Sequence, residues 1–103
     1  MKKIENVKIE VRGEQLIDEN KEKICSLTCI KAVLNNCEYK NREDQRQADK
    51  IYQKLEKLEN EVKEIELEDA EFELIKKYVE DYIPFRRGRT FVPFLNSLED
   101  GEK

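Results

Sequence analysis

Residues 42–65, "REDQRQADKIYQKLEKLENEVKEI", carry the sharpest hydrophobic periodicity of the chain. Apolar side chains recur there at alternating intervals of three and four residues, and Tyr52 widens the stripe that they form. This is the a/d pattern of a heptad repeat, which predicts an amphipathic helix from about Arg42 to Val62. The seam residues are Ala48, Ile51, Leu55, Leu58, Val62 and Ile65.

The seam spans about two and a half heptads, which is shorter than the three or four heptads of a free-standing coiled coil. Two interpretations therefore stay open. In one, the seam packs against another helix of the same domain. In the other, it packs against another subunit, so that the chain forms a homo-oligomer. The subunit interface would then consist of Ile51, Tyr52, Leu55, Leu58 and Val62.

Two further helices are predicted on either side of this one. The stretch "SLTCIKAVLNN" at 26–36 predicts a helix with Ser26 as its N-cap and an apolar face that repeats every three to four residues. Residues 69–83 predict a helix that Asp69 opens and that ends before Pro84, because a proline pushes the preceding residue out of the helical region. Its buried stripe would contain Leu74, Ile75, Tyr78, Val79, Tyr82 and Ile83.

The N-terminal region has a different pattern. Residues 4–20 show near period-two alternation from Val7 onward and a turn glycine at position 13, which predicts a strand, a turn and a second short strand. Residues 65–67 predict a brief extended segment. A last short helix is predicted after Thr90, its cap, with Pro93 in the first turn.

These elements predict an α+β fold in which a short N-terminal β-hairpin packs on a three- to four-helix bundle. A chain of 103 residues is expected to form a single domain. We expect the hairpin within residues 1–24, the helical part within 25–98 and a flexible tail at 99–103.

Composition excludes several classes of function. The chain contains no histidine, which removes histidine-based acid–base and nucleophilic catalysis, so we expect no enzyme activity and no catalytic residue. Its net charge of −4 argues against broad binding to duplex nucleic acid. No apolar run is long enough to span a membrane and no signal-peptide core follows the start, so we expect no membrane partner.

The three cysteines Cys25, Cys29 and Cys37 are an odd number without a secretory context. We expect them to be reduced thiols in a cytoplasm, packed as small apolar side chains. A structural zinc site needs four ligands, usually in closely spaced pairs, and three thiols without histidine do not supply them. We therefore predict neither a metal site nor a cofactor.

Acidic residues are concentrated just before the C-terminal quarter of the chain. Residues 62–82 contain three lysines and eight acidic residues, a net charge of −5. Paired carboxylates for hydrolysis or Mg²⁺ are one interpretation, although no phosphate-binding loop accompanies them. In a second interpretation these residues form the solvent-exposed N-terminal end of a helix. In a third, they form an acidic face that binds a basic protein surface.

Residues 83–94, "IPFRRGRTFVPF", form a local positive segment directly after the acidic one. Guanidinium groups bind phosphate and carboxylate in bidentate fashion, and aromatic rings stack on bases. An anion site is thus one interpretation. In the other, the arginines stabilise the C-terminal end of the preceding helix and pair with Glu80 or Asp81. The candidate ligand-binding residues are Arg86, Arg87, Arg89, Tyr82, Phe85 and Phe91.

A pattern of short motifs runs through almost the whole chain. It comprises Gly13, Ser26-Leu27, Val33-Leu34-Asn35, Ala48-Asp49-Lys50-Ile51-Tyr52, Leu74-Ile75-Lys76, Gly88-Arg89 and the segment 95–98. This order resembles small accessory proteins of unknown function that bacteriophages and prophages of Firmicutes encode. The resemblance implies a phage protein that acts by binding, and it carries no catalytic motif. Arg86 and Arg87 depart from the pattern, whereas Arg89 belongs to it, which favours a structural role for Arg89.

The expected function is that of a non-enzymatic phage protein of the anti-defence type, located in the host cytoplasm. It would antagonise a bacterial process by masking a host protein or by sequestering an anionic ligand such as a signalling nucleotide. The alternative is a structural, assembly or DNA-metabolism accessory protein that acts through protein–protein contacts, with the arginines engaged inside the molecule.

Overall fold

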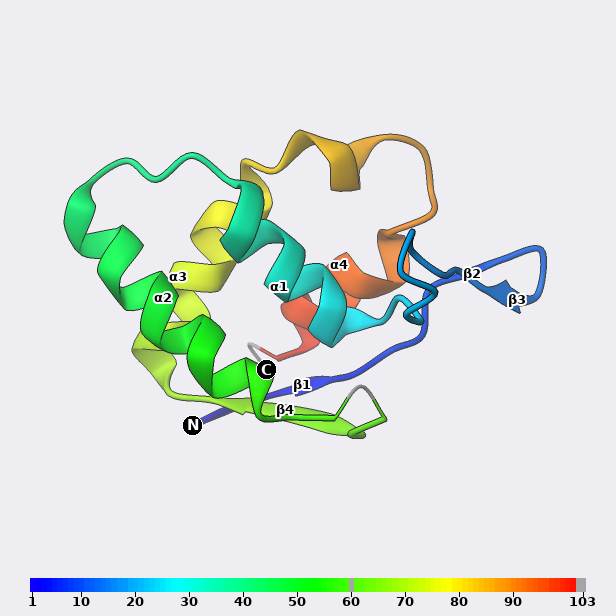
Figure 1. Ribbon diagram of the computed structural model, residues 1–103, viewed down its shortest axis with the longest axis horizontal. Helices are drawn as coiled ribbons and strands as arrows, with labels where there is room; N and C mark the ends of the chain where they lie inside the picture. Colours follow the sequence, from blue (N-terminus) through cyan, green and yellow to red (C-terminus); the bar gives the residue numbers. More distant parts are fainter. Residues whose placement is uncertain (60, 102–103) are drawn as a thin grey trace.

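The computed structural model describes residues 1–59 and 61–101 and confirms the α+β class (Figure 1). Four α-helices and a two-stranded antiparallel sheet form the body of the molecule, and a second strand pair forms a small hairpin. In chain order the elements are β1 (Lys2–Glu5), β2 (Glu10–Val11), β3 (Glu14–Gln15), α1 (Ser26–Asn36), α2 (Arg42–Glu56), β4 (Glu64–Leu67), α3 (Asp69–Glu80), the 3₁₀ helix η1 (Ile83–Arg86) and α4 (Val92–Asp100).

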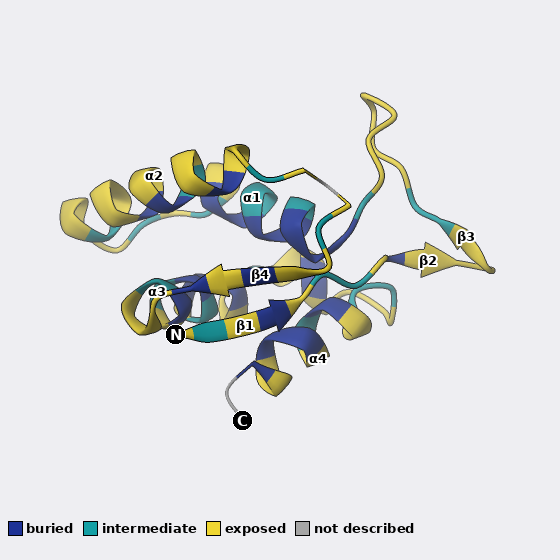
Figure 2. Ribbon diagram, turned by 90° about the horizontal axis from the view of Figure 1, so that it is seen from below, coloured by how far each residue is buried: buried dark blue, intermediate teal, exposed yellow. Residues whose placement is uncertain are grey.

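The main sheet pairs the first strand with a strand about sixty residues later. β1 and β4 are antiparallel, with Ile4 opposite Ile65 and Lys2 opposite Leu67. These side chains alternate with exposed charged ones, so one face of the sheet packs on the helices and the other faces solvent (Figure 2). The brief extended segment predicted at 65–67 is confirmed as part of β4.

The predicted hairpin is present, but its two strands are shorter than the alternating sequence pattern predicts. β2 and β3 join through a turn in which Arg12 and Gly13 have positive φ angles of 54° and 83°. Ile4 and Ile9 are buried, whereas Val11 is exposed, so the apparent single strand from Ile4 to Val11 is two strands of two different sheets. The hairpin projects from the body of the molecule (Figures 1 and 2).

Helix α1 has the predicted bounds but a different cap. Cys25 is the N-cap residue, and its N–H donates to the Thr28 hydroxyl at 2.8 Å. Ser26 is fully buried instead, where its hydroxyl accepts from the Val7 N–H at 3.1 Å and lies 3.3 Å from the Ser97 hydroxyl. The prediction of Ser26 as N-cap was wrong because this serine links α1 to α4 and to the chain after β1.

The ends of the two later helices also differ from the sequence prediction. Glu68, not Asp69, caps α3 and forms a capping box with Glu71. Phe91, not Thr90, is the N-cap residue of α4, and Pro93 lies in the first turn as predicted. The tail predicted to be flexible is helical through Asp100, and the buried Gly101 lies against Phe72. Residues 102 and 103 lie outside the described residues.

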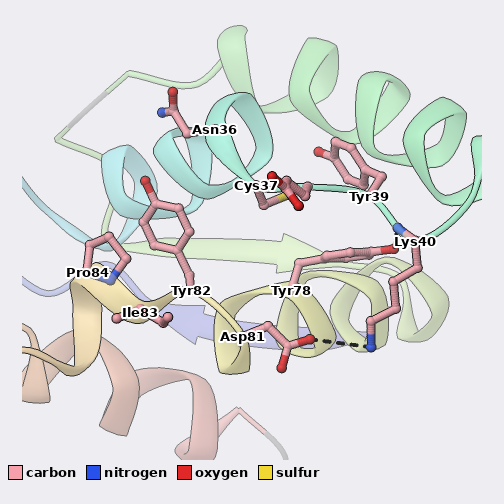
Figure 3. A pocket seen from close by; sticks show the side chains of 10 residues that line it. Asn36, Cys37, Tyr39, Lys40, Tyr78, Asp81, Tyr82, Ile83 and Pro84 are labelled. Atoms are coloured by element: carbon pink, nitrogen blue, oxygen red, sulfur yellow. Dashed lines mark hydrogen bonds and ion pairs between the residues drawn. The ribbon is translucent and has the colours of Figure 1, made fainter.

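The connection between α1 and α2 packs against the C-terminal end of α3. Tyr39 from the connection and Tyr78 from α3 meet edge to face, with ring centroids 5.0 Å apart (Figure 3). Tyr78 and its helix neighbours Ile75 and Val79 are buried, as the predicted stripe requires. Ile83 is an exception, because α3 ends at Glu80 and the 3₁₀ helix turns Ile83 into solvent, where it is 56% exposed.

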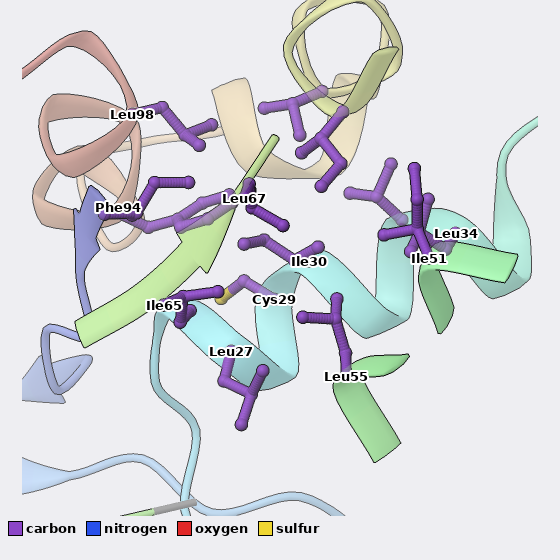
Figure 4. Close-up of a cluster of buried hydrophobic side chains, with 14 of the residues drawn as sticks. Leu27, Cys29, Ile30, Leu34, Ile51, Leu55, Ile65, Leu67, Phe94 and Leu98 are labelled. Atoms are coloured by element: carbon purple, nitrogen blue, oxygen red, sulfur yellow. The ribbon is translucent and has the colours of Figure 1, made fainter. Parts of the chain in front are cut away.

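The seam of α2 lies inside the single chain. Ala48, Ile51 and Leu55 are at most 2% exposed and pack in the core around α1 (Figure 4). The helix ends at Glu56, six residues earlier than predicted, so Leu58 and Val62 follow it as half-buried side chains and Ile65 belongs to β4. Ile51 and Leu55 therefore offer no surface to another subunit, and the interpretation as an internal seam is the one that the burial supports.

We expect Leu55→Glu to unfold the protein, because it would place a carboxylate at a site where the native side chain is fully buried. Leu55→Ala should lower the free energy of unfolding by about 2–5 kcal/mol, the usual cost of such a truncation. Circular dichroism melts measure the stability of both variants, and light scattering measures their oligomeric state. The exposed Glu56→Gln on the same helix is the control and should change little. A folded, monomeric Leu55→Glu variant would instead indicate a seam shared between subunits.

Candidate functional site

The three arginines lie on one exposed turn between η1 and α4, which we call the arginine turn (residues 86–89). Arg86 ends η1, Arg87 follows in extended conformation, and Gly88 adopts a positive φ of 67° that lets the chain reverse. Arg86, Arg87 and Arg89 are all exposed.

The guanidinium groups of the arginine turn have no ion pair or hydrogen bond within the part of the chain that the structure describes. The carboxylate of Asp81, a predicted partner, instead pairs with the Lys40 ammonium at 3.4 Å. The interpretation in which the arginines pair back to Glu80 or Asp81 is therefore wrong for this conformation. Three unpaired positive charges remain on one short connection.

The aromatic residues predicted to accompany the arginines form a packed cluster beneath the turn. The Phe85 ring lies 4.9 Å from Tyr82, 4.6 Å from Phe91 and 5.3 Å from Phe94, measured between centroids. Phe85 is only 6% exposed, which supports a packing role for its ring, and a part in ligand binding stays a prediction. Tyr82 and Phe91 are half-buried and pack on Phe85. The cluster holds the turn in place rather than presenting three free rings.

A cavity of about 370 Å³ adjoins one of the three arginines. It lies between α3 and α4, where Val79, Leu95 and Leu98 supply apolar lining and Arg86 and Lys76 supply positive charge. The carboxylates of Glu80 and Glu99 also line the cavity and balance the two positive charges. Arg87 and Arg89 do not, so this cavity does not bring the arginine turn together around one ligand.

A second cavity, of about 550 Å³, lies between the α1–α2 connection and the end of α3 (Figure 3). We call it the tyrosine pocket, because Tyr39, Tyr78 and Tyr82 line it. Cys37, Lys40 and Asp81 also line it, and the ion pair between Lys40 and Asp81 spans its edge in Figure 3.

Hydrogen bonds fix two of the three tyrosines. The Tyr39 hydroxyl donates to the Leu34 carbonyl at 2.6 Å. The Tyr78 hydroxyl donates to Asp44 Oδ2 at 2.6 Å and accepts from the Lys40 N–H at 3.1 Å. Asp44 also accepts from the Lys77 ammonium at 3.0 Å. The hydrogen bond from Tyr78 is the largest cause of the lowered pKa of Asp44, and that from Lys77 comes next.

The thiols of Cys29 and Cys37 are not activated for nucleophilic chemistry. Burial raises the pKa of the Cys29 thiol far above its ordinary value, and the nearby Cys25 raises it further. Burial also raises the pKa of Cys37. A thiol reacts as its thiolate, so the raised pKa values make Cys29 and Cys37 less reactive than an ordinary thiol. Among residues 1–59 and 61–101, no three acidic or thiol side chains converge as metal ligands.

The chain matches no protein-family model, no curated protein and no solved structure. Its resemblance to phage accessory proteins therefore stays a prediction. Within the described residues, no helix is both long enough and apolar enough to cross a membrane.

The tyrosine pocket is the part of the surface that the sequence did not indicate. Tyr39 stands in "CEYKNRED", which has the composition of a polar connection and no periodicity. Asp44 is one of many charged residues near the start of α2. The nearest signal was Tyr39 itself, a bulky aromatic residue in a connection that is otherwise polar, since such residues usually pack against something.

We expect Asp44→Asn to be less stable than the wild type at pH 7 but not at low pH. The folded-state pKa of Asp44 is lowered, so the carboxylate stabilises the fold above the ordinary value of 3.8 and this contribution is lost as the pH falls below it. Urea unfolding at pH 7, 5 and 3 measures the difference between the two proteins.

The control for this pH series is Glu56→Gln, which removes an exposed carboxylate at the end of the same helix. This variant should follow the wild type throughout. A stability difference for Asp44→Asn that stays constant from pH 7 to pH 3 would contradict a role for the ionised carboxylate.

Proposed function

We propose that this chain is a non-enzymatic phage accessory protein that binds an acidic surface of a host protein through the arginine turn and so masks it. The host cytoplasm is the expected compartment, and the affected process would be a bacterial defence or another host activity. The resemblance noted in the sequence supports a phage origin. The unpaired arginine turn supports binding as the mode of action.

The observation that carries this proposal is the exposure of three guanidinium groups that have no partner among residues 1–59 and 61–101. Arginine is weakly hydrated and forms paired hydrogen bonds with carboxylates, which makes it a frequent contributor to binding energy at interfaces. Two exposed aliphatic side chains flank the turn in sequence, Ile83 at 56% and Val92 at 41% exposed. Positive charge beside apolar surface is the composition expected of a protein-docking patch.

The shape of the turn favours a protein partner over a small nucleotide. Small-molecule sites are concave and bury most of their ligand. Arg86 lines a cavity that Arg87 and Arg89 do not share, and Phe85 lies in the core. A nucleotide sandwiched between these arginines and aromatic rings would require the packed cluster to open.

Non-enzymatic action is supported by the available side chains. The chain has no histidine, and the buried thiols of Cys25 and Cys29 lie inside the core. Self-association stays a prediction. The burial of Ile51 and Leu55 leaves Tyr52, Leu58 and Val62 as the half-buried candidates for an interface. This weakens the alternative of an assembly protein that acts through the heptad seam.

The proposal predicts that Arg86→Ala/Arg87→Ala loses a host partner that the wild type retains. Immobilised protein would be exposed to a Firmicutes lysate, and retained proteins would be identified by mass spectrometry. We expect an acidic protein whose affinity falls by roughly tenfold or more per arginine removed, as for arginines at the centre of an interface. Binding should weaken with added salt, because exposed charges attract through a screened field.

Arg46→Ala/Lys50→Ala is the matched control, since it removes two exposed positive charges from α2 and leaves the turn intact. This variant should retain the partner. Equal retention by the turn variant would exclude the arginine turn as the docking site. A rise in melting temperature with a cyclic or linear nucleotide that Arg86→Ala/Arg87→Ala abolishes would favour nucleotide sequestration instead.

A further inference from the structure

We propose that the tyrosine pocket binds an alkylammonium group, the positively charged nitrogen head of a methylated amine. The proposal concerns a different surface from the arginine turn and does not depend on a host protein partner. It rests on three features of the pocket: its aromatic lining, its excess of acidic groups and the ammonium that it already holds.

The aromatic lining is the first feature. Tyr39 reaches the pocket from the α1–α2 connection, and Tyr78 and Tyr82 reach it from the end of α3 and the residues after it (Figure 3). Aromatic rings attract cations through the negative potential of their faces, and clusters of such rings recognise quaternary ammonium groups. Tyr78 is only 1% exposed and already has the Lys77 ammonium over its ring, 5.4 Å from the centroid, so the half-buried Tyr39 and Tyr82 supply the accessible rings of the lining.

The lining is held in its shape before any ligand arrives. Tyr39 is fixed by its hydrogen bond to Leu34, and Tyr78 by its bonds with Asp44 and Lys40. The Tyr82 ring packs on Phe85 at 4.9 Å. Burial raises the pKa of the Tyr39 and Tyr78 hydroxyls further above neutral pH, so both remain hydrogen-bond donors. A site whose side chains are already ordered loses less conformational entropy on binding.

The charges around the pocket favour a cation over an anion. Asp81 and Glu38 line it, and Lys40 is its single positively charged lining residue. The ammonium of Lys40 lies 3.4 Å from the Asp81 carboxylate, and both side chains are more than half exposed, at 58% and 61%. An exposed pair of this kind contributes little stability, so a ligand can replace it at low cost. Lys40 is thus an intramolecular competitor for the site.

The size of the pocket suits a headgroup with a short substituent. A volume of about 550 Å³ falls within the range of small-molecule sites. Methylated ammonium groups also bind few water molecules tightly, whereas the primary ammonium of lysine is strongly hydrated. An aromatic pocket therefore favours the methylated form.

Choline and 3,3-dimethylbutan-1-ol test the proposal, because the second has the shape of the first without its charge. Tyrosine fluorescence reports binding, since the chain contains four tyrosines and no tryptophan. Two-dimensional amide NMR locates the affected residues. We expect choline to bind at millimolar concentrations and at least about tenfold more tightly than the neutral alcohol, with shifts centred on residues 37–40 and 78–82.

Two exposed residues give variants that should fold normally. Asp81→Asn should weaken choline binding several-fold, and Lys40→Met should strengthen it, because the competing ammonium is removed. Tyr82→Leu should weaken binding by roughly 2–30-fold, the range of one cation–π contact. The controls Glu56→Gln and Tyr52→Leu alter residues that do not line the pocket and should leave choline binding unchanged.

A trimethyl-lysine peptide separates the two possible sources of the group. Tighter binding of the peptide than of choline assigns the site to a methylated protein, and the reverse assigns it to a free amine; either result supports the proposal. Equal binding of choline and the neutral alcohol, no binding of any probe, or weaker binding by Lys40→Met would overturn it.

Discussion

The antiparallel pairing of β1 with β4 is the contact on which the rest of this structure depends. It places Ile4 beside Ile65 and so fixes the sheet face on which the helices pack. Asn6 extends the connection beyond the strands. Its side chain accepts from the Leu27 N–H at 2.9 Å and donates to the Val62 carbonyl at 2.8 Å. One asparagine thus joins the end of β1, the start of α1 and the approach to β4.

The sequence predicted the parts of the fold that are specified locally. The bounds of α1 and most of the buried stripe of α3 follow from patterns within a few turns of helix, although α3 ends at Glu80, three residues before the predicted end at Ile83. The partner of β1 did not follow, because strand pairing over sixty residues leaves no local pattern. The last residue of the heptad seam was assigned to the wrong element. Ile65 continues the spacing of Ile51 and Leu55, but α2 ends at Glu56. Ile65 is buried because it lies on the inward face of strand β4.

For the candidate sites too, the sequence predicted the features that are specified locally and not those that depend on contacts between distant segments. The charge pattern of the sequence indicated the arginine turn, whereas its exposure and its lack of ion pairs with the other described residues are properties of the folded chain. It could not reveal that Asp81 would pair with Lys40, a residue some forty positions earlier, or that Phe85 would become the centre of an aromatic cluster. The tyrosine pocket arises where two distant segments meet, so Tyr39 and Tyr82 acquire a shared environment only in three dimensions.

The separation of β1 from β4 has a consequence for synthesis on the ribosome. Elongation at roughly 5–20 residues per second means that β1 emerges about 3–12 seconds before its partner strand exists. During this interval Ile4 has no β4 partner, although it is fully buried in the folded chain. The charged residues on either side of Ile4 in "KKIE" are expected to reduce association of the unpaired strand with other chains, because charge on an exposed strand edge opposes such pairing.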